Sequence, residues 1–264
     1  MQLYLINLDR RPDRLAAMTA RAGALGLALT RIPAVDAATT PAAGLDALFA
    51  ASGPLGVLPR GDKACFLSHR RAWQALMESG AAHAVILEDD VRLSGTGRPF
   101  LASDDWVPPG AGLIKLEHYG PRGQRVLLTD FRPVDTRMGT NFRLGRILSR
   151  HTGAAAYVIA RQTAQNLLAQ TRFALPVDHL MFNPNNSPLF AGLAPLQLLP
   201  AIARQQEFVG EKSDIEGTRK PLRALSPGYA RRELVRFGYD LRLVPRQLAA
   251  LARGARFMAM KTAD

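Results

Sequence analysis

The chain has 264 residues, 34 of them Lys or Arg and 22 Asp or Glu, and a single cysteine, Cys65, so an intramolecular disulfide is excluded. The formal net charge of +12 comes from two segments: residues 122–150 hold 7 basic and 2 acidic side chains, residues 219–264 hold 11 and 3, and the rest is nearly neutral. The length suits one large domain, with or without an appendage, and the apolar stretch 189–203 contains two prolines, so no membrane span is expected.

Strand and helix patterns alternate along the body of the chain. Apolar runs and alternating stretches predict strands at residues 2–7, 28–33, 84–90, 113–116 and 154–160. Amphipathic patterns predict helices at 12–25, 62–79 and 161–170, and the proline-containing stretch 37–60 predicts a loop with a short helix. This order predicts the α/β class, a sheet with helices on both faces.

Residues 84–90, Ala-Val-Ile-Leu-Glu-Asp-Asp, form an apolar run that ends on three carboxylates. Such a run predicts a central strand buried on both faces, and ligands bind at the ends of such strands. Because side chains alternate along a strand, Glu88 and Asp90 are expected to point one way and Asp89 the other. Paired carboxylates suit Mg²⁺ or Mn²⁺ in contact with a phosphate, and the alternative is an acidic turn that only closes the strand.

The expected helix at 62–79 has an apolar side that carries Cys65 and Trp73. Cys65 is therefore expected to be a small buried residue rather than a nucleophile. Ser68 and His69 fall on or beside the same side. They either face a cleft beneath the acidic strand end or are core residues with local hydrogen bonds.

The basic tail predicts two amphipathic helices separated at Pro245. One arc of the second helix is apolar and the other is basic. The apolar arc holds Leu248, Leu251, Ala252, Ala255 and Met258, and the basic arc Arg246, Arg253 and Arg256. This pattern is typical of a helix on an anionic membrane surface, and equally of a basic helix packed on the body. Nucleic acid is not expected as a partner, because the tail lacks an aromatic stacking array and a known binding motif.

Three segments of the chain occur in the same order in one known family. They read Tyr-Leu-Ile-Asn-Leu-Asp-Arg-Arg-Pro-Asp-Arg at 4–14, Cys-Phe-Leu-Ser-His-Arg-Arg-Ala-Trp at 65–73 and Ile-Leu-Glu-Asp-Asp-Val at 86–91, with weaker matches at 153–159 and 176–179. The chain therefore resembles glycosyltransferase family 25, the lipooligosaccharide galactosyltransferase family. The resemblance implies a catalytic domain at 1–216, and the basic amphipathic tail occupies 217–264.

The family resemblance implies a GT-A-like fold, a nucleotide-sugar donor, usually UDP-galactose, and inversion at the anomeric carbon. Arg10 or Arg14 is expected to contact phosphate and Asp9 the uridine or ribose, unless these charges only open the helix at Pro12. The donor-binding residues implied are Asn7, Asp9, Arg10, Arg14, Ser68, His69 and Asp89.

The chemistry implied by the resemblance needs a cation and a base. Glu88 and Asp90 are expected to hold Mn²⁺ or Mg²⁺, which would stabilise the departing diphosphate, and His179 either completes the metal shell or packs. The candidate base for the acceptor hydroxyl is Asp178, whose alternative role is an N-cap. Glu117 is the reserve base.

These features predict a metal-dependent inverting glycosyltransferase that moves galactose to a lipooligosaccharide or other surface glycan. It would work in the cytoplasm, peripherally on the inner face of the bacterial inner membrane. The basic segment 122–150 either receives an anionic acceptor or is a solvated loop. Relatives often carry glycine before the Ser-His motif, where this chain has Ala64-Cys65. The identity of the donor sugar is therefore left open. The alternatives are another UDP-sugar donor, or a non-catalytic membrane or nucleic-acid binding protein that uses its tail.

Overall fold

The structure of the chain is a computed structural model that describes residues 1–120, 124–134, 141–205 and 227–263, with the backbone alone at 227–237 and 240. Its strands are β1 (Gln2–Asn7), β2 (Thr30–Pro33), β3 (His83–Glu88), β4 (Val91–Leu93), β5 (Leu113–Lys115), β6 (Glu117–His118), β7 (Arg125–Pro133), β8 (Arg143–Ile147), β9 (Ala156–Ala160), β10 (Leu196–Leu199), β11 (Ala203–Gln205) and β12 (Arg256–Ala259). Its helices are α1 (Pro12–Ala24), α2 (Ala42–Asp46), α3 (Arg60–Ser79), α4 (Arg98–Ala102), α5 (Arg161–Leu168), α6 (Val177–Phe182), α7 (Phe190–Leu193) and α8 (Pro227–Ala252), with a 3₁₀ turn at Gly95–Gly97.

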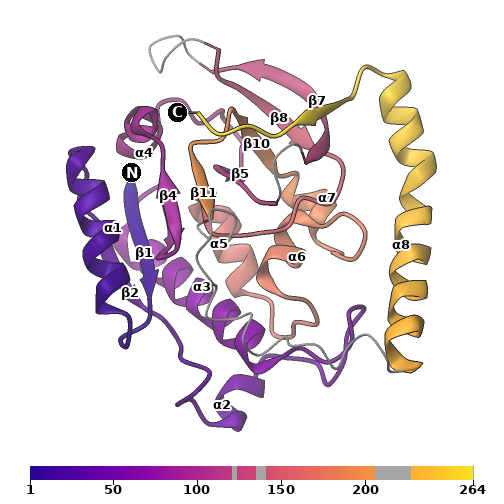
Figure 1. Cartoon of the computed structure of the whole chain (residues 1–264), viewed down its shortest axis with the longest axis horizontal. Coiled ribbons are helices and arrows are strands. Elements are labelled where there is room, and N and C mark those ends of the chain that lie inside the picture. The colour runs from indigo at the N-terminus through magenta and orange to yellow at the C-terminus, as the bar shows by residue number, and fades with distance from the viewer. Residues whose placement is uncertain (121–123, 135–140, 206–226, 264) are drawn as a thin grey trace.

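A mixed nine-stranded sheet forms the centre of the described part of the chain (Figure 1). Its order is β12-β7-β8-β10-β5-β9-β3-β1-β2, and a separate three-stranded sheet has the order β4-β11-β6. β1 runs parallel to both β2 and β3, so the carboxyl ends of these three strands meet at one edge. β9 is antiparallel to β3 and β5, β10 is parallel to β5, and β8, β7 and β12 follow with antiparallel pairings.

The apolar core lies on both faces of the large sheet. Along β1, Leu5 packs in a cluster with Met18 of α1, whereas its neighbour Ile6 packs in a second cluster with Trp73 of α3. Residues 84–87 of β3 are fully buried, as predicted for a central strand between two helical layers. The predicted α/β class is therefore confirmed.

The elements predicted for the body are confirmed to within a few residues. The helix predicted at 62–79 is α3, which starts two residues earlier and ends at Ser79, where Gly80, with a φ of +73°, provides a left-handed C-cap before β3. The loop predicted at 37–60 contains the short helix α2. The strand predicted at 84–90 ends at Glu88 rather than at Asp90.

The tail differs from the two predicted helices. One helix, α8, runs through Pro245, and residues 256–259 form β12, which pairs with β7 at the edge of the large sheet. The prediction of a second amphipathic helix is therefore wrong at 256–259. Phe257, which falls on the basic side of a helical wheel, is half exposed on this edge strand. A four-residue strand has too few residues to show its period, and its partner lies about 130 positions away.

The basic segment 122–150 contains β7 and β8, so the solvated-loop alternative is wrong for those two stretches. The predicted domain boundary between 216 and 217 lies outside the described residues. No helix in the described ranges combines the length and apolar character that crossing a bilayer requires.

Candidate functional site

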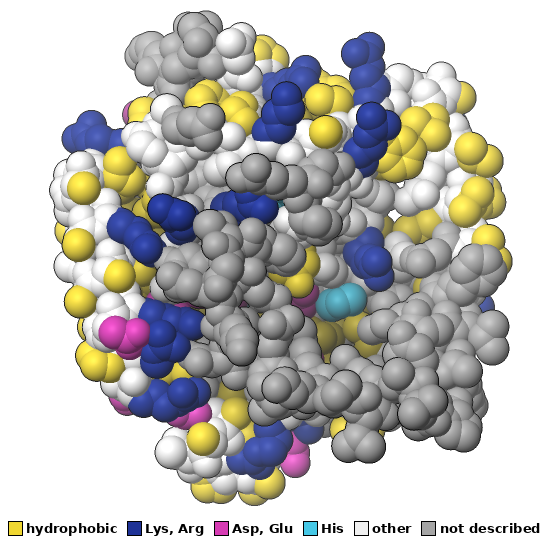
Figure 2. Space-filling view, in the orientation of Figure 1, with side chains coloured by type: hydrophobic (Ala, Val, Ile, Leu, Met, Phe, Trp, Pro, Cys, Tyr) yellow, Lys and Arg dark blue, Asp and Glu magenta, His cyan; other side chains and the backbone are white. Residues whose placement is uncertain are grey.

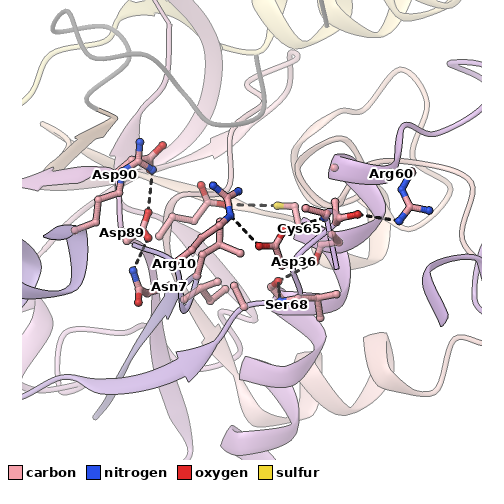
Figure 3. A pocket seen from close by; sticks show the side chains of 18 of the residues that line it. Asn7, Arg10, Asp36, Arg60, Cys65, Ser68, Asp89 and Asp90 are labelled. Atoms are coloured by element: carbon pink, nitrogen blue, oxygen red, sulfur yellow. Dashed lines mark hydrogen bonds and ion pairs between the residues drawn. The ribbon is translucent and has the colours of Figure 1, made fainter. Parts of the chain in front are cut away.

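A cavity of about 500 Å³ opens where β1, β2 and β3 end (Figure 3). Four segments of the sequence supply its wall, within residues 6–14, 34–38, 59–68 and 88–90. The parallel strand order explains this convergence, because carboxyl ends of parallel strands share one edge and carry ligand-binding loops.

All three carboxylates of the acidic triplet line this cavity. β3 ends at Glu88 and the chain turns at Asp89 and Asp90, so the expected alternation, with Asp89 facing away, is wrong. Asp89 Oδ2 accepts a hydrogen bond from Nδ2 of the buried Asn7 at 2.7 Å, and its Oδ1 lies 3.2 Å from Arg14 Nη1. Burial raises the pKa of Asp89, whereas these two donors oppose the rise.

Asp90 has the geometry and electrostatics of a cation ligand. Its Oδ1 is buried and has no hydrogen-bond partner in the described part of the chain. Burial, followed by repulsion from Glu88 and Asp89, raises the pKa of Asp90 well above its ordinary value. A divalent cation beside the triplet would relieve both penalties, and carboxylate oxygens suit Mg²⁺ and Mn²⁺.

Glu88 is held by a hydrogen-bonded relay of buried side chains. Trp73 Nε1 donates to the Tyr157 hydroxyl at 2.9 Å, this hydroxyl lies 2.9 Å from His69 Nδ1, and His69 Nε2 lies 3.1 Å from Glu88 Oε1. Since an indole only donates, the Tyr157 hydroxyl keeps its own proton, which Nδ1 accepts when His69 is the Nε2–H tautomer. Nε2 then carries the hydrogen and donates it to Glu88. His69 is therefore a core residue with a function, since it orients a residue of the cavity wall.

Cys65 is half-buried and lines the cavity, with Sγ 3.7 Å from Glu88 Oε1. Burial, with the Glu88 carboxylate beside it, raises the pKa of the Cys65 thiol well above its ordinary value. The thiol therefore stays protonated, which agrees with the predicted absence of a nucleophile, although its place in the cavity wall was not predicted. Cys65, His69 and Glu88 bring ligand-type atoms within 4.8 Å of one another, and in the Nε2–H tautomer of His69 that nitrogen donates to Glu88.

The cavity wall also contains positive groups. Arg10 lies 2.8 Å from Asp36, a residue that sequence reasoning missed although it follows β2 as Asp9 follows β1. The backbone N–H of Ala38 and the Arg10 guanidinium hold the pKa of Asp36 below its usual value. α3 begins at Arg60, so the partial positive charge of its N-terminus also faces the cavity.

The structure does not place every predicted donor-binding residue in the wall. Asn7, Arg10, Arg14, Ser68 and Asp89 line the cavity, whereas Asp9 is exposed and pairs with Arg31, and His69 lies behind Glu88.

Ser68 fits both alternatives, because it lines the cavity and its hydroxyl makes local hydrogen bonds. Its hydroxyl donates to the carbonyl of Ala64 and accepts from the N–H of Val35, each at 2.8 Å. It therefore fixes the loop after β2 against α3, which shapes the cavity.

The predicted bases and third metal ligand lie outside the cavity wall. Asp178 is half-buried in α6, where its Oδ2 accepts from the N–H of Gly153 at 3.2 Å, and the N-cap of α6 is Pro176, so the N-cap alternative is wrong. Its charge contributes to the raised pKa of Cys65, a residue of the cavity wall. His179 Nδ1 lies 2.8 Å from Asn183 Nδ2, and its role as a ligand stays a prediction.

Glu117 is fully buried in a pair with Lys115. Its Oε1 lies 2.8 Å from Lys115 Nζ and accepts from the N–H of Ala155 at 2.9 Å. Burial raises the pKa of Glu117 and lowers that of Lys115. A carboxylate enclosed in this way has no path to a sugar hydroxyl, which favours a structural role over that of reserve base.

Comparisons with known proteins agree on one family. Residues 1–181 match the model of glycosyltransferase family 25 (LPS biosynthesis protein). The lacto-N-neotetraose biosynthesis glycosyltransferase LgtB of Neisseria gonorrhoeae is 29% identical over 219 residues, which cover 78% of this chain and 75% of that protein. The lipooligosaccharide biosynthesis protein lic2B of Haemophilus influenzae is 28% identical over 155 residues, 56% of this chain and 55% of that protein.

Among solved structures, a glycosyltransferase involved in the glycosylation of the major capsid of PBCV-1 aligns with 82% of this chain and 96% of that chain, at 9% identity and a TM-score of 0.35. At that score the likeness carries no argument about the fold. The architecture rests on the strand order described above.

Proposed function

The chain belongs to glycosyltransferase family 25, and from that premise we propose that it transfers galactose from UDP-galactose to a hydroxyl of a lipooligosaccharide or related surface glycan, with inversion. The similarity to LgtB and lic2B, both named for the biosynthesis of such glycans, supports this acceptor class. The GT-A-like character of the nucleotide-binding sheet is part of the same proposal.

One observation carries the proposal: a single cavity joins an acidic strand end to two arginines and a helix N-terminus. A nucleoside diphosphate sugar that binds with a cation needs positive groups for its phosphates and acidic groups for the cation. Arg10 and Arg14 supply planar donors that match phosphate oxygens, and the N-terminus of α3 supplies a partial positive charge. The volume of about 500 Å³ lies within the range of small-molecule sites.

The acidic wall fits a divalent cation, because Asp90 offers a buried oxygen without a hydrogen-bond partner among the described residues. Glu88 and Asp90 are the residues that would hold it. Bound Mn²⁺ or Mg²⁺ would neutralise the charge that develops on the departing diphosphate. Glu88 Oε1 lies 3.1 Å from His69 Nε2, whereas Oε2 accepts from Gln205 Nε2 at the longer distance of 3.4 Å. Oε2 is therefore the oxygen that is more open to a cation.

Asp178 remains the proposed general base for the acceptor hydroxyl. It is half-buried, and unlike Glu117 it is not paired with a buried lysine. Asp178→Asn should then lower kcat by about 10²-fold or more, with donor binding unchanged. Unchanged turnover would remove Asp178 from the reaction.

The proposal is tested with a panel of UDP-sugars, each with Mn²⁺, Mg²⁺ or excess chelator, scored by calorimetric binding and by release of UDP. We expect UDP-galactose with a cation to give the tightest binding and the fastest release. Faster release from UDP-glucose or UDP-N-acetylglucosamine would keep the enzyme class and change the donor. Full turnover under chelation would overturn the role of the acidic triplet, and the absence of binding to any nucleotide sugar would overturn catalysis.

A further inference from the structure

The described part of α8 carries an exposed apolar stripe. Leu241, Val244, Leu248 and Leu251 recur at spacings of three, four and three, which places them on one face of a helix. Leu241 is 52% exposed and Leu248 60% exposed. Six large apolar side chains are exposed in the described ranges, and all except Val57 lie between residues 241 and 257. Such concentration marks an interaction surface.

The stripe is not the face that holds α8 to the body. Leu243 is buried, and Gln247 Nε2 donates to the carbonyl of Leu148 at 3.4 Å. These two residues are four apart and define the inward face. At 100° per residue, Leu241 and Leu248 lie more than a quarter turn from both and point outward, whereas Val244 and Leu251 lie closer to Gln247, on one flank between the inward and outward faces.

The flank of α8 on the other side of its outward face carries charge of one sign. Arg242, Arg246 and Arg253 share the flank of the helix between its inward and outward faces, and all three are exposed. Residues 241–263 contain five basic side chains and no Asp or Glu. Figure 2 shows hydrophobic side chains along the right-hand rim over α8, with Lys and Arg side chains at the upper right of the same face.

We propose that the outward side of α8 docks on an anionic lipid bilayer, with Leu241, Val244, Leu248 and Leu251 toward one flank and the three arginines on the other. An apolar stripe with a cationic flank matches the acyl boundary and the headgroups of such a bilayer. A second copy of the chain fits less well, because it would bring an equally positive face against the first with no acidic side chain to pair. If the acceptor is lipid-linked, as in the proposed function on which this step rests, docking there would keep the chain at the surface that carries its acceptor.

The test is sedimentation of the full chain with vesicles of phosphatidylcholine alone or mixed with phosphatidylglycerol. Wild type should bind the anionic vesicles, and less so at high salt. Each arginine near an anionic surface contributes about fivefold, so Arg242→Gln/Arg246→Gln/Arg253→Gln should weaken binding about a hundredfold. Leu241→Asp/Leu248→Asp should abolish it. Val57→Asp, at an apolar side chain 68% exposed elsewhere, is the matched control and should bind as wild type.

Three results would overturn the proposal: no binding by wild type, equal binding to neutral vesicles, or equal losses in the Val57→Asp control. A dimer by light scattering that Leu248→Asp dissolves would assign the stripe to a second copy instead. Thermal unfolding of each variant checks the fold. Release of UDP in solution should be unchanged in the α8 variants, so failure of docking is distinguishable from failure of the proposed function.

Discussion

The two ends of the large sheet use charge in opposite ways. At the edge formed by β1, β2 and β3, the three carboxylates of the acidic triplet are buried or half-buried, and Asn7 and Arg14 orient Asp89. At the far edge, around β12 and α8, charges of one sign lie exposed beside exposed leucines. A charge removed from water acts strongly on what enters its cavity, whereas an exposed charge acts on surfaces. The buried charges therefore belong to the proposed chemistry at the cavity edge, and the exposed charges belong to the proposed docking at the edge with β12 and α8.

If buried charge distinguishes the cavity edge, its removal should have the largest effect on activity. Glu88→Gln keeps the shape and the hydrogen bond to His69 but removes the charge that faces a cation. We expect kcat to fall about 10³-fold, or about 4 kcal/mol of transition-state stabilisation. Release of UDP under saturating donor and Mn²⁺ measures this loss.

Asp46→Asn serves as the acidic control for Glu88→Gln, because Asp46 lies outside the cavity wall in an exposed pair with Lys63. Its turnover should match wild type, since exposed ion pairs contribute little. Equal losses in both variants would show that net charge, rather than position in the cavity, controls turnover.

The buried pair of Lys115 and Glu117 tests whether enclosed charge is structural. Glu117→Gln leaves the lysine without its counter-charge, so the free energy of unfolding should fall by about 3 kcal/mol. The double variant Lys115→Met/Glu117→Gln removes both charges and keeps an acceptor for the N–H of Ala155, so it should recover most of that loss. Chemical denaturation measures both. A Glu117→Gln variant that folds normally but is inactive would restore Glu117 as a base.

Sequence patterns predicted the cavity edge better than the far edge, for physical reasons. The triplet at 88–90 follows an apolar strand, and the parallel order of β1 and β3 brings it to Asn7 and Arg14, so local patterns are enough. Tyr157 lies 88 positions from His69, and no periodicity links them. β12 is short and pairs with a distant strand, which is why a helix was predicted at 256–259.

Asp90 is expected to lower the stability of the folded chain as pH rises, although its charge would serve to hold a cation. Its pKa is raised in the folded chain, so the folded state binds more protons than the unfolded state and stability falls as pH rises from about 4, the ordinary Asp pKa, through the folded value. Asp90→Asn removes this fall. Without metal or nucleotide, the variant should have a Tm roughly 2–4 °C above wild type at pH 8 and the same Tm at pH 4. A Tm difference independent of pH would contradict a buried carboxylate.

The smallest expected effect comes from the relay behind Glu88. Tyr157→Phe removes the hydroxyl that accepts from Trp73 and fixes His69 with its proton on Nε2. The unfolding free energy should fall by about 1–2 kcal/mol, and turnover by about threefold to tenfold, since Glu88 loses a fixed donor. Long-range ¹H–¹⁵N spectra of the histidine rings should show the Nε2–H tautomer of His69 in wild type and a mixture in the variant.

Tyr4→Phe is the matched control for Tyr157→Phe, because the Tyr4 hydroxyl donates at 3.0 Å to the carbonyl of Ala75 and takes no part in the relay. It should cost similar stability and no turnover. His69→Gln places an amide N–H where Nε2–H stood and should retain more activity than His69→Leu, which has no donor. If the His69→Gln and His69→Leu variants lose equal turnover, or if Tyr4→Phe loses as much turnover as Tyr157→Phe, His69 contributes packing alone. Glu88 is then oriented by the backbone.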